Sequence, residues 1–98
     1  MPAYLGLDVG TTGCRSSLIG GDAQPLAGVQ TPLPAPVHAG AAVEQDAALW
    51  WAALGDNLDA LKRQADLAGV AAICIDGTSS TLLLCDAAGA PLAPALMY

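Results

Sequence analysis

The 98-residue sequence predicts an α/β fold in which a β-meander comes first, one helix follows, and further strands end the chain. Three observations predict this order. Residues 1–31 hold three short strand-like runs separated by glycine-containing turns. Residues 46–68 carry apolar side chains at helical spacing, and residues 70–98 hold apolar runs that end at aspartates. Alanine supplies much of the 54% apolar content, so we expect at most one domain, with a thin core.

The runs of the meander are short and end at turn-forming residues. They cover residues 3–8, 14–19 and 24–31. The third run is the least regular, because Pro25 limits one end and Gly28 weakens the middle. We therefore expect three strands joined by two tight turns.

The helix follows a segment without regular structure. Residues 32–42 contain three prolines and show no period, so we expect an extended surface connection in which His38 is solvated or packed. Asp46 suits the N-cap position, and apolar residues recur every three or four positions from Trp50 onward. Gly69 suits the left-handed position that ends a helix. Trp50 itself is expected to pack, since it belongs to the apolar stripe.

Two apolar runs follow the helix. Residues 70–75 end at Asp76, a polar turn follows, and residues 81–85 form the second run. Residues 91–98 can supply a further strand, which Pro94 would place at a sheet edge. The three cysteines each lie in apolar runs, so they are expected to be buried and reduced.

The charge balance restricts the partners. Three basic residues stand against nine acidic ones, and the net charge is −6. Nucleic acids and anionic membrane surfaces need a basic footprint, so neither is expected to bind. No apolar stretch reaches the ~18 residues of a membrane span, and no targeting segment precedes the first strand, which predicts a cytoplasmic protein.

The segment LDVGTTGCR, residues 7–15, carries the strongest chemical signal. A strand delivers Asp8 to its end, and the glycine-containing turn exposes backbone N–H groups beside two threonine hydroxyls, a nest suited to phosphate. Asp8 is a candidate ligand of magnesium, which favours one or two carboxylates and keeps several waters. The candidate phosphate-binding residues are Gly10, Thr11, Thr12, Gly13 and Arg15. Arg15 either neutralises phosphoryl charge or is exposed on an outer strand, and a plain hairpin turn is the alternative interpretation of the whole segment.

Three segments in the same order resemble the N-terminal portion of the FGGY carbohydrate kinases. LDVGTTGCR resembles their first phosphate motif, VEQDAALWW the entry to their first helix, and IDGTSST their sugar-contacting turn. The following LLLCDAAGAPLAPALMY resembles their next strand, turn and strand. The resemblance implies the ribonuclease H-like fold of actin, Hsp70 and hexokinase, with a mixed sheet and a β-hairpin phosphate loop. It also implies that residues 1–98 are only the first part of an N-terminal lobe.

The resemblance further implies an ATP- and Mg²⁺-dependent phosphotransferase acting on a ketopentose, D-xylulose or D-ribulose. Asp8 would organise the metal and the phosphate, and the turn residues named above would bind the nucleotide. The sugar would contact Asp76, Thr78, Ser79 and Ser80. The family's catalytic base lies beyond residue 98, so these 98 residues alone are expected to be inactive without the C-terminal remainder of the kinase. A homodimer is compatible with the resemblance.

Two other classes stay open. An Hsp70-like or actin-like ATPase uses a similar hairpin to drive conformational change in a partner, and VEQDAALWW with DGTSST favours the kinase over it. A small binding module complete at 98 residues would fold cooperatively and bind its ligand alone, whereas a truncated lobe would leave sheet edges unpaired.

Overall fold

The structure, a computed structural model that describes residues 2–98, measures 49 × 28 × 21 Å. Its elements in chain order are β1 (Ala3–Val9), β2 (Gly13–Gly20), β3 (Pro25–Pro32), β4 (Val37–Ala39), β5 (Ala42–Gln45), α1 (Ala47–Gln64), β6 (Val70–Gly77) and β7 (Ala95–Met97). No helix in this described part of the chain combines the length and the apolarity that crossing a membrane requires.

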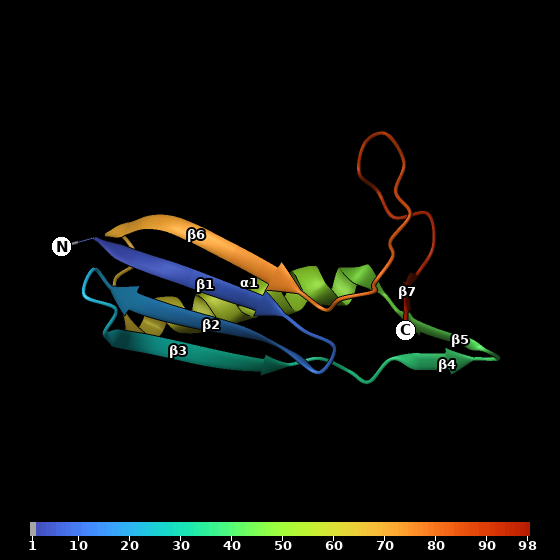
Figure 1. The fold of residues 1–98 in the computed structure, drawn as a ribbon, viewed down its shortest axis with the longest axis horizontal. Coiled ribbons are helices and arrows are strands. Elements are labelled where there is room, and N and C mark those ends of the chain that lie inside the picture. The colour runs from blue at the N-terminus through green and yellow to red at the C-terminus, as the bar shows by residue number, and fades with distance from the viewer. Residues whose placement is uncertain (1) are drawn as a thin grey trace.

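The main sheet has the strand order β3-β2-β1-β6 (Figure 1). β1, β2 and β3 pair antiparallel as a meander, whereas β6 lies parallel to β1. Parallel neighbours need a crossover connection, and α1 lies within it. The chain therefore has the predicted α/β fold with a mixed sheet.

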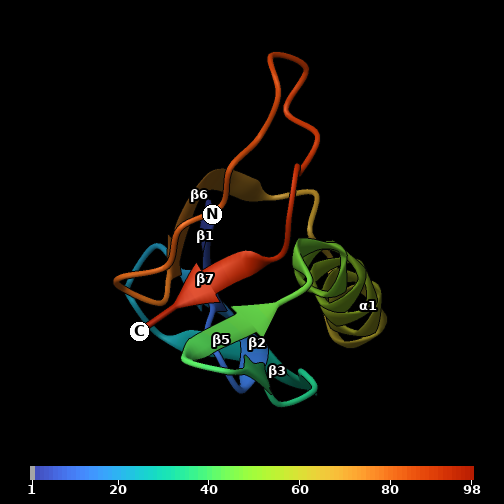
Figure 2. The same ribbon diagram turned by 90° about the vertical axis from the view of Figure 1, so that its right-hand side faces the viewer.

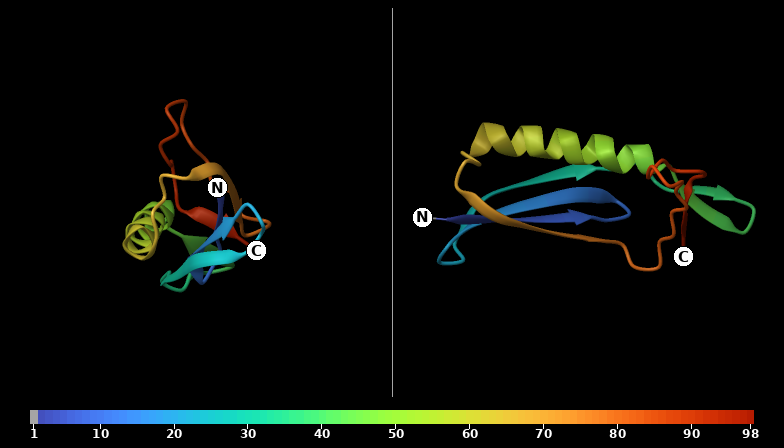
Figure 3. Two further views of the ribbon diagram at one scale, coloured as in Figure 1. Left: turned by 90° about the vertical axis from the view of Figure 1, so that its left-hand side faces the viewer. Right: turned by 90° about the horizontal axis from the view of Figure 1, so that it is seen from above.

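The core lies between α1 and one face of this sheet. Alternate residues of a strand point to opposite faces, so Leu5 and Leu7 of β1 share the face that α1 covers. They are 5% and 8% exposed, and Leu61 of α1 is fully buried against them. Figure 3 shows α1 running along the length of the sheet. Asp8 is consequently directed to the opposite face, which no helix of residues 2–98 covers.

The helix begins as predicted and ends earlier. The Asp46 carboxylate accepts a hydrogen bond from the Ala48 N–H at 2.9 Å, which makes Asp46 the N-cap. At the other end α1 stops at Gln64, so the predicted extension to residue 68 was wrong. Asp66 accepts a bond from the Ala68 N–H at 2.9 Å, and this side-chain turn competes with further helical bonding. Gly69 is not the cap; its carbonyl accepts from the N–H of Ala3.

A second, three-stranded sheet has the order β4-β5-β7. Its β4–β5 hairpin lies in and beyond the segment expected to be an extended connection, and Gly40 makes the turn with φ of 62°. The connection prediction failed because all three prolines precede β4, which leaves Val37–Ala39 free to pair. His38 is exposed on β4. Viewed end-on, β5 and β7 lie in front of the main sheet, with α1 beside them (Figure 2).

The predicted strand over residues 81–85 did not form. The run makes only isolated bridges, Leu82 with Leu96 and Cys85 with Pro91. Leu82 is 55% exposed, because it lies in an irregular excursion and the single bridge to Leu96 of β7 does not cover it. In Figure 1 this excursion, between β6 and β7, projects away from both sheets.

The outer edge of β6 has no partner strand among residues 2–98. Ile73 and Ile75 of β6 stay 62% and 58% exposed, because α1 packs over β2 and β3 instead. The prediction of three buried cysteines was confirmed for Cys14 on β2 and wrong for Cys74 on β6 and Cys85 in the excursion, which are exposed. Cys74 alternates with Ile73 and Ile75, so it lies on the face that no helix of residues 2–98 covers. Apolar residues in the sequence were thus insufficient to bury this edge.

Candidate functional site

The turn between β1 and β2 is closed by a hydrogen bond from the Gly10 N–H to the Gly13 carbonyl at 2.9 Å. The Arg15 side chain lies directly over this turn. A Cβ atom on Gly10 would stand 2.7 Å from Nη2 of Arg15, closer than real contacts allow. Gly10 therefore makes room for the guanidinium group, a role that the sequence analysis did not assign to it.

Arg15 is paired with Asp8, its partner across the β1–β2 hairpin. Its Nε and Nη2 atoms donate to Oδ2 of Asp8 at 2.8 and 2.6 Å. Both side chains stay more than a third exposed, on the uncovered face of the sheet. Arg15 thus lies on an exposed face, one of the two alternatives that the sequence offered, and its guanidinium is bonded to Asp8.

Asp76 lies next to Asp8, because the two residues are register partners on the parallel strands β1 and β6. The interaction with Asp76, followed by the bonds from Arg15, holds the pKa of Asp8 below its ordinary value. The interaction with Asp8 and the negative charge of that carboxylate raise the pKa of Asp76. A cavity of about 330 Å³ opens beside this group, and Cys74 and Ser17 complete its wall.

The phosphate-type turn and the turn after β6 are joined directly. The hydroxyl oxygens of Thr11 and Thr78 are 3.1 Å apart and hydrogen-bonded. Ser79 and Ser80 are exposed beyond Thr78, and Ser80 adopts a left-handed φ of 58°. Two segments predicted separately to bind phosphate and sugar therefore lie in contact.

Thr12 points elsewhere. It is exposed and lines a separate cavity of about 320 Å³, together with Gly13 and Arg15 and with residues of β3. Arg15 borders this cavity and the one beside Asp76, so its guanidinium separates two openings of the same surface.

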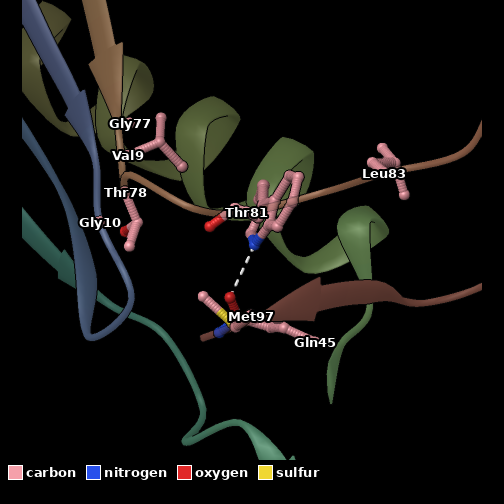
Figure 4. Close-up of a pocket in the computed structure, with 9 residues that line it drawn as sticks. Val9, Gly10, Gln45, Gly77, Thr78, Thr81, Leu83 and Met97 are labelled. Carbon is pink, nitrogen blue, oxygen red and sulfur yellow. Dashed lines mark hydrogen bonds between the residues drawn. The ribbon is translucent and has the colours of Figure 1, made fainter. Parts of the chain in front are cut away.

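A further pocket, of about 250 Å³, lies where β1 and β6 end (Figure 4). Val9, Gly10, Gly77 and Thr78 form one side of it, and Gln45 and Met97 face them from the small sheet. Trp50 of α1 also lines it and donates from Nε1 to Oε1 of Gln45 at 2.8 Å, the bond dashed in Figure 4. Sequence reasoning missed Gln45 and treated Trp50 as packing only; the one available signal was their presence in VEQDAALWW.

The donor chemistry of the site suits a hard cation with most of its ligands supplied by water or phosphate. Asp8 and Asp76 offer two neighbouring carboxyls, which matches the one or two that Mg²⁺ uses in nucleotide sites. Within residues 2–98, no group of three or more His, Cys, Asp or Glu side chains could form a full protein cage.

Comparisons with known proteins agree with this geometry. A protein described as a xyloylose kinase from Brucella ovis is 28% identical, with a TM-score of 0.90 over 96% of this chain and 20% of that one. A xylulose kinase from Rhodospirillum rubrum is also 28% identical, with a TM-score of 0.86 over 97% of this chain and 20% of that one. A gluconate kinase from Lactobacillus acidophilus, which is 22% identical, shares the fold with a TM-score of 0.84 over 97% of this chain and 19% of that one.

The chain thus spans about a fifth of the length of these structures. None of the curated proteins compared with it matches. The family model that matches residues 3–98 describes the N-terminal domain of the FGGY carbohydrate kinases. Because this match covers nearly the whole sequence, the chain belongs to the FGGY family of carbohydrate kinases, in its N-terminal domain.

Proposed function

We propose that this chain is the N-terminal part of a longer cytoplasmic kinase that transfers the γ-phosphoryl group of ATP to a hydroxyl of a ketopentose, D-xylulose or D-ribulose. One observation carries the proposal: the Thr11–Thr78 hydrogen bond joins a phosphate-type turn to a polar turn. Phosphoryl transfer needs the donor and the acceptor held together, because its catalysis is mainly positioning and charge stabilisation.

On the nucleotide side, the turn residues Gly10, Thr11, Thr12 and Gly13 bind the phosphates of ATP. Asp8, with Asp76 beside it, holds Mg²⁺, which would neutralise phosphate charge when bound. Arg15 keeps the Asp8 carboxylate ionised and oriented through its two bonds at 2.8 and 2.6 Å. Hydrogen bonds between two charged groups are strong, so the pair of Arg15 and Asp8 by itself fixes the position of this carboxylate.

On the sugar side, Thr78, Ser79 and Ser80 present hydroxyls after β6, and Asp76 shapes the start of that turn. Hydroxyls and a carboxyl can bond several hydroxyl groups of a polyol. The ketopentose assignment is supported by the similarity to two 28% identical structures, a xyloylose kinase and a xylulose kinase. The base that accepts the proton of the sugar hydroxyl lies beyond residue 98, so the chain by itself is inactive in this proposal.

The test uses the full-length protein that contains this chain. Sugar-dependent ATP consumption is measured with D-xylulose, D-ribulose, gluconate and glycerol, for the wild type and for Asp8→Ala. Asp8→Ala should lower kcat by at least about a hundredfold, the lower end of the range for losing one preorganised group that stabilises transition-state charge, and should change the KM for the sugar much less. Asp56→Ala, at an exposed position on α1, is the matched control and should keep wild-type kinetics.

Turnover with a ketopentose above the other acceptors supports the assignment. Turnover with gluconate or glycerol alone keeps the kinase and overturns the sugar. ATP consumption stimulated by unfolded peptide instead of sugar would favour a chaperone-type ATPase, and unchanged kcat in Asp8→Ala would overturn the metal role.

A further inference from the structure

Gln45 is a buried polar residue whose bonds connect separate parts of the site. It ends β5 and is 4% exposed. Its Nε2 atom donates to the carbonyl of Thr11 at 3.3 Å and to the carbonyl of Pro34 at 3.2 Å. Its Oε1 atom accepts from the indole Nε1 of Trp50 at 2.8 Å. Both amide hydrogens and the carbonyl oxygen are therefore engaged.

This pattern fixes the orientation of the amide. If the amide were flipped, its NH₂ group would face the indole N–H, and its oxygen would face two carbonyl oxygens. Each of these contacts would leave a buried polar group without a partner, which is costly. Gln45 thus has a single favourable orientation, set by two main-chain carbonyls and one indole.

The groups that Gln45 joins belong to different functions. Thr11 lies in the phosphate-type turn, whereas Trp50 is a wall of the 250 Å³ pocket that Thr78 also lines. Figure 4 shows Gln45 facing Gly10 and Thr78 across this pocket. The hydrogen bond between Thr11 and Thr78 is a second connection between the phosphate turn and the lining of this pocket. One buried side chain therefore connects the phosphate turn to the pocket wall.

We infer that Gln45 is a positioning residue, which holds the phosphate turn and the Trp50 wall of the 250 Å³ pocket, where the sugar would bind beside Thr78, in one fixed geometry. The inference rests on the proposed kinase function. Gln45 acts through Thr11 and Trp50, whose positions it fixes by hydrogen bonds. Its two N–H groups serve the phosphate turn, and its oxygen serves the pocket wall, so the two effects can be separated by substitution.

Three variants of the full-length protein separate them. Gln45→Met has a similar length and loses every bond. Gln45→Glu keeps an acceptor for Trp50 and loses the two donors to the main chain. Trp50→Phe removes the indole donor and leaves the bonds to the main chain. Gln24→Glu and Trp51→Phe are the matched controls, because both residues are exposed and Trp51 is 79% exposed.

Steady-state kinetics with ATP and the best sugar give the readout. Losing the donors, in Gln45→Met and Gln45→Glu, should lower kcat/KM for ATP about tenfold, the size of one buried hydrogen bond. Losing the indole bond, in Gln45→Met and Trp50→Phe, should raise the KM for sugar about tenfold. Trp50→Phe should leave the KM for ATP near the wild-type value, and both controls should be unchanged.

If the variants only contain a smaller fraction of active protein and keep all wild-type KM values, Gln45 merely supports the fold and the inference is overturned. If the wild type shows no sugar-dependent turnover, the proposed function fails instead. The connection is then tested by thermal denaturation of Gln45→Met, Trp50→Phe and the double variant. Both changes remove the same bond, so the Tm of the double variant should fall by less than the sum of the two single-variant shifts. A fall equal to that sum would overturn the connection.

Discussion

Asn57 offers the most direct test of how the strands under the phosphate turn are held. It is fully buried in the middle of α1, where the helix crosses β2 and β3. Its Nδ2 atom donates to the carbonyls of Cys14 and Val29 and to the hydroxyl of Thr31, each at 3.1 Å. Two amide hydrogens are thus shared among three oxygens, directly beneath the strand that starts at Gly13.

The substitution Asn57→Asp keeps the shape and replaces the donor by an oxygen. A carboxylate would then face three oxygens in a fully buried site, and an uncompensated buried charge costs about 3–5 kcal/mol. Asn57→Leu is uncharged and leaves two buried carbonyls without this donor, at the lower end of ~1–3 kcal/mol each. Part of that loss is offset, because Oδ1 of Asn57 has no hydrogen-bond partner among residues 2–98. We expect a net loss of about 1–2 kcal/mol for Asn57→Leu.

Urea denaturation of the full-length protein measures both losses, with the m-value checked for constancy. The expected order of destabilisation is Asp above Leu, and the Asp penalty should shrink as the pH falls. The sign follows from burial, which raises the pKa of the introduced carboxyl, so protonation restores a donor at acid pH. If packing volume alone mattered, the nearly isosteric Asn57→Asp would be the milder change, and that order would refute the reasoning.

Three further outcomes follow from the geometry. Gly13→Ala should cost about 1–3 kcal/mol in urea denaturation and raise the KM for ATP, because its Cβ would stand 2.9 Å from the Thr31 carbonyl. Leu61→Ala, at a fully buried position, should lower the free energy of unfolding by about 2–5 kcal/mol. The pKa of Asp76 is raised in the fold, so its stabilisation is complete below the ordinary aspartate pKa and is lost as pH rises through the raised value. Asp76→Asn should flatten that part of a Tm–pH profile, measured without metal.

The lowered pKa of Asp8 acts in the opposite sense. Its stabilisation is present above the ordinary pKa of an aspartate and is lost as pH falls through the lowered value. In Asp76→Asn the bonds from Arg15 to Asp8 remain, so the profile should retain part of the fall in Tm at the acid end. Loss of both slopes in this single variant would contradict the contribution of Arg15 to the lowered pKa of Asp8.

Local signals made the meander and the start of the helix predictable. Glycine-containing turns bound β1 and β2, and Asp46 needs only its own neighbour, Ala48, to form the cap. The β4–β5 hairpin gave no such signal, because it is short and follows a proline-rich run without periodicity. Its pairing is stabilised by β7, which lies about fifty residues further along the chain.

The candidate site divides in the same way. Asp8, Gly10 and Arg15 lie within one hairpin, so their segment could be singled out from spacing alone. Gln45 and Asn57 could not, because their partners are main-chain oxygens 11–43 residues away, which leave no trace in side-chain patterns. Asn57 even interrupts the apolar stripe of α1, so the pattern alone gives no sign that it is fully buried.

The unpaired edge of β6 bears on the order in which a longer protein containing this chain would fold. The meander and α1 consist of contacts close in sequence, so they can assemble early, as the polypeptide leaves the ribosome. β6 would then wait with Ile73 and Ile75 in water until a later segment arrives. During that interval the unpaired edge could form non-native strand pairs, and a ribosome-associated chaperone would be expected to bind this strand.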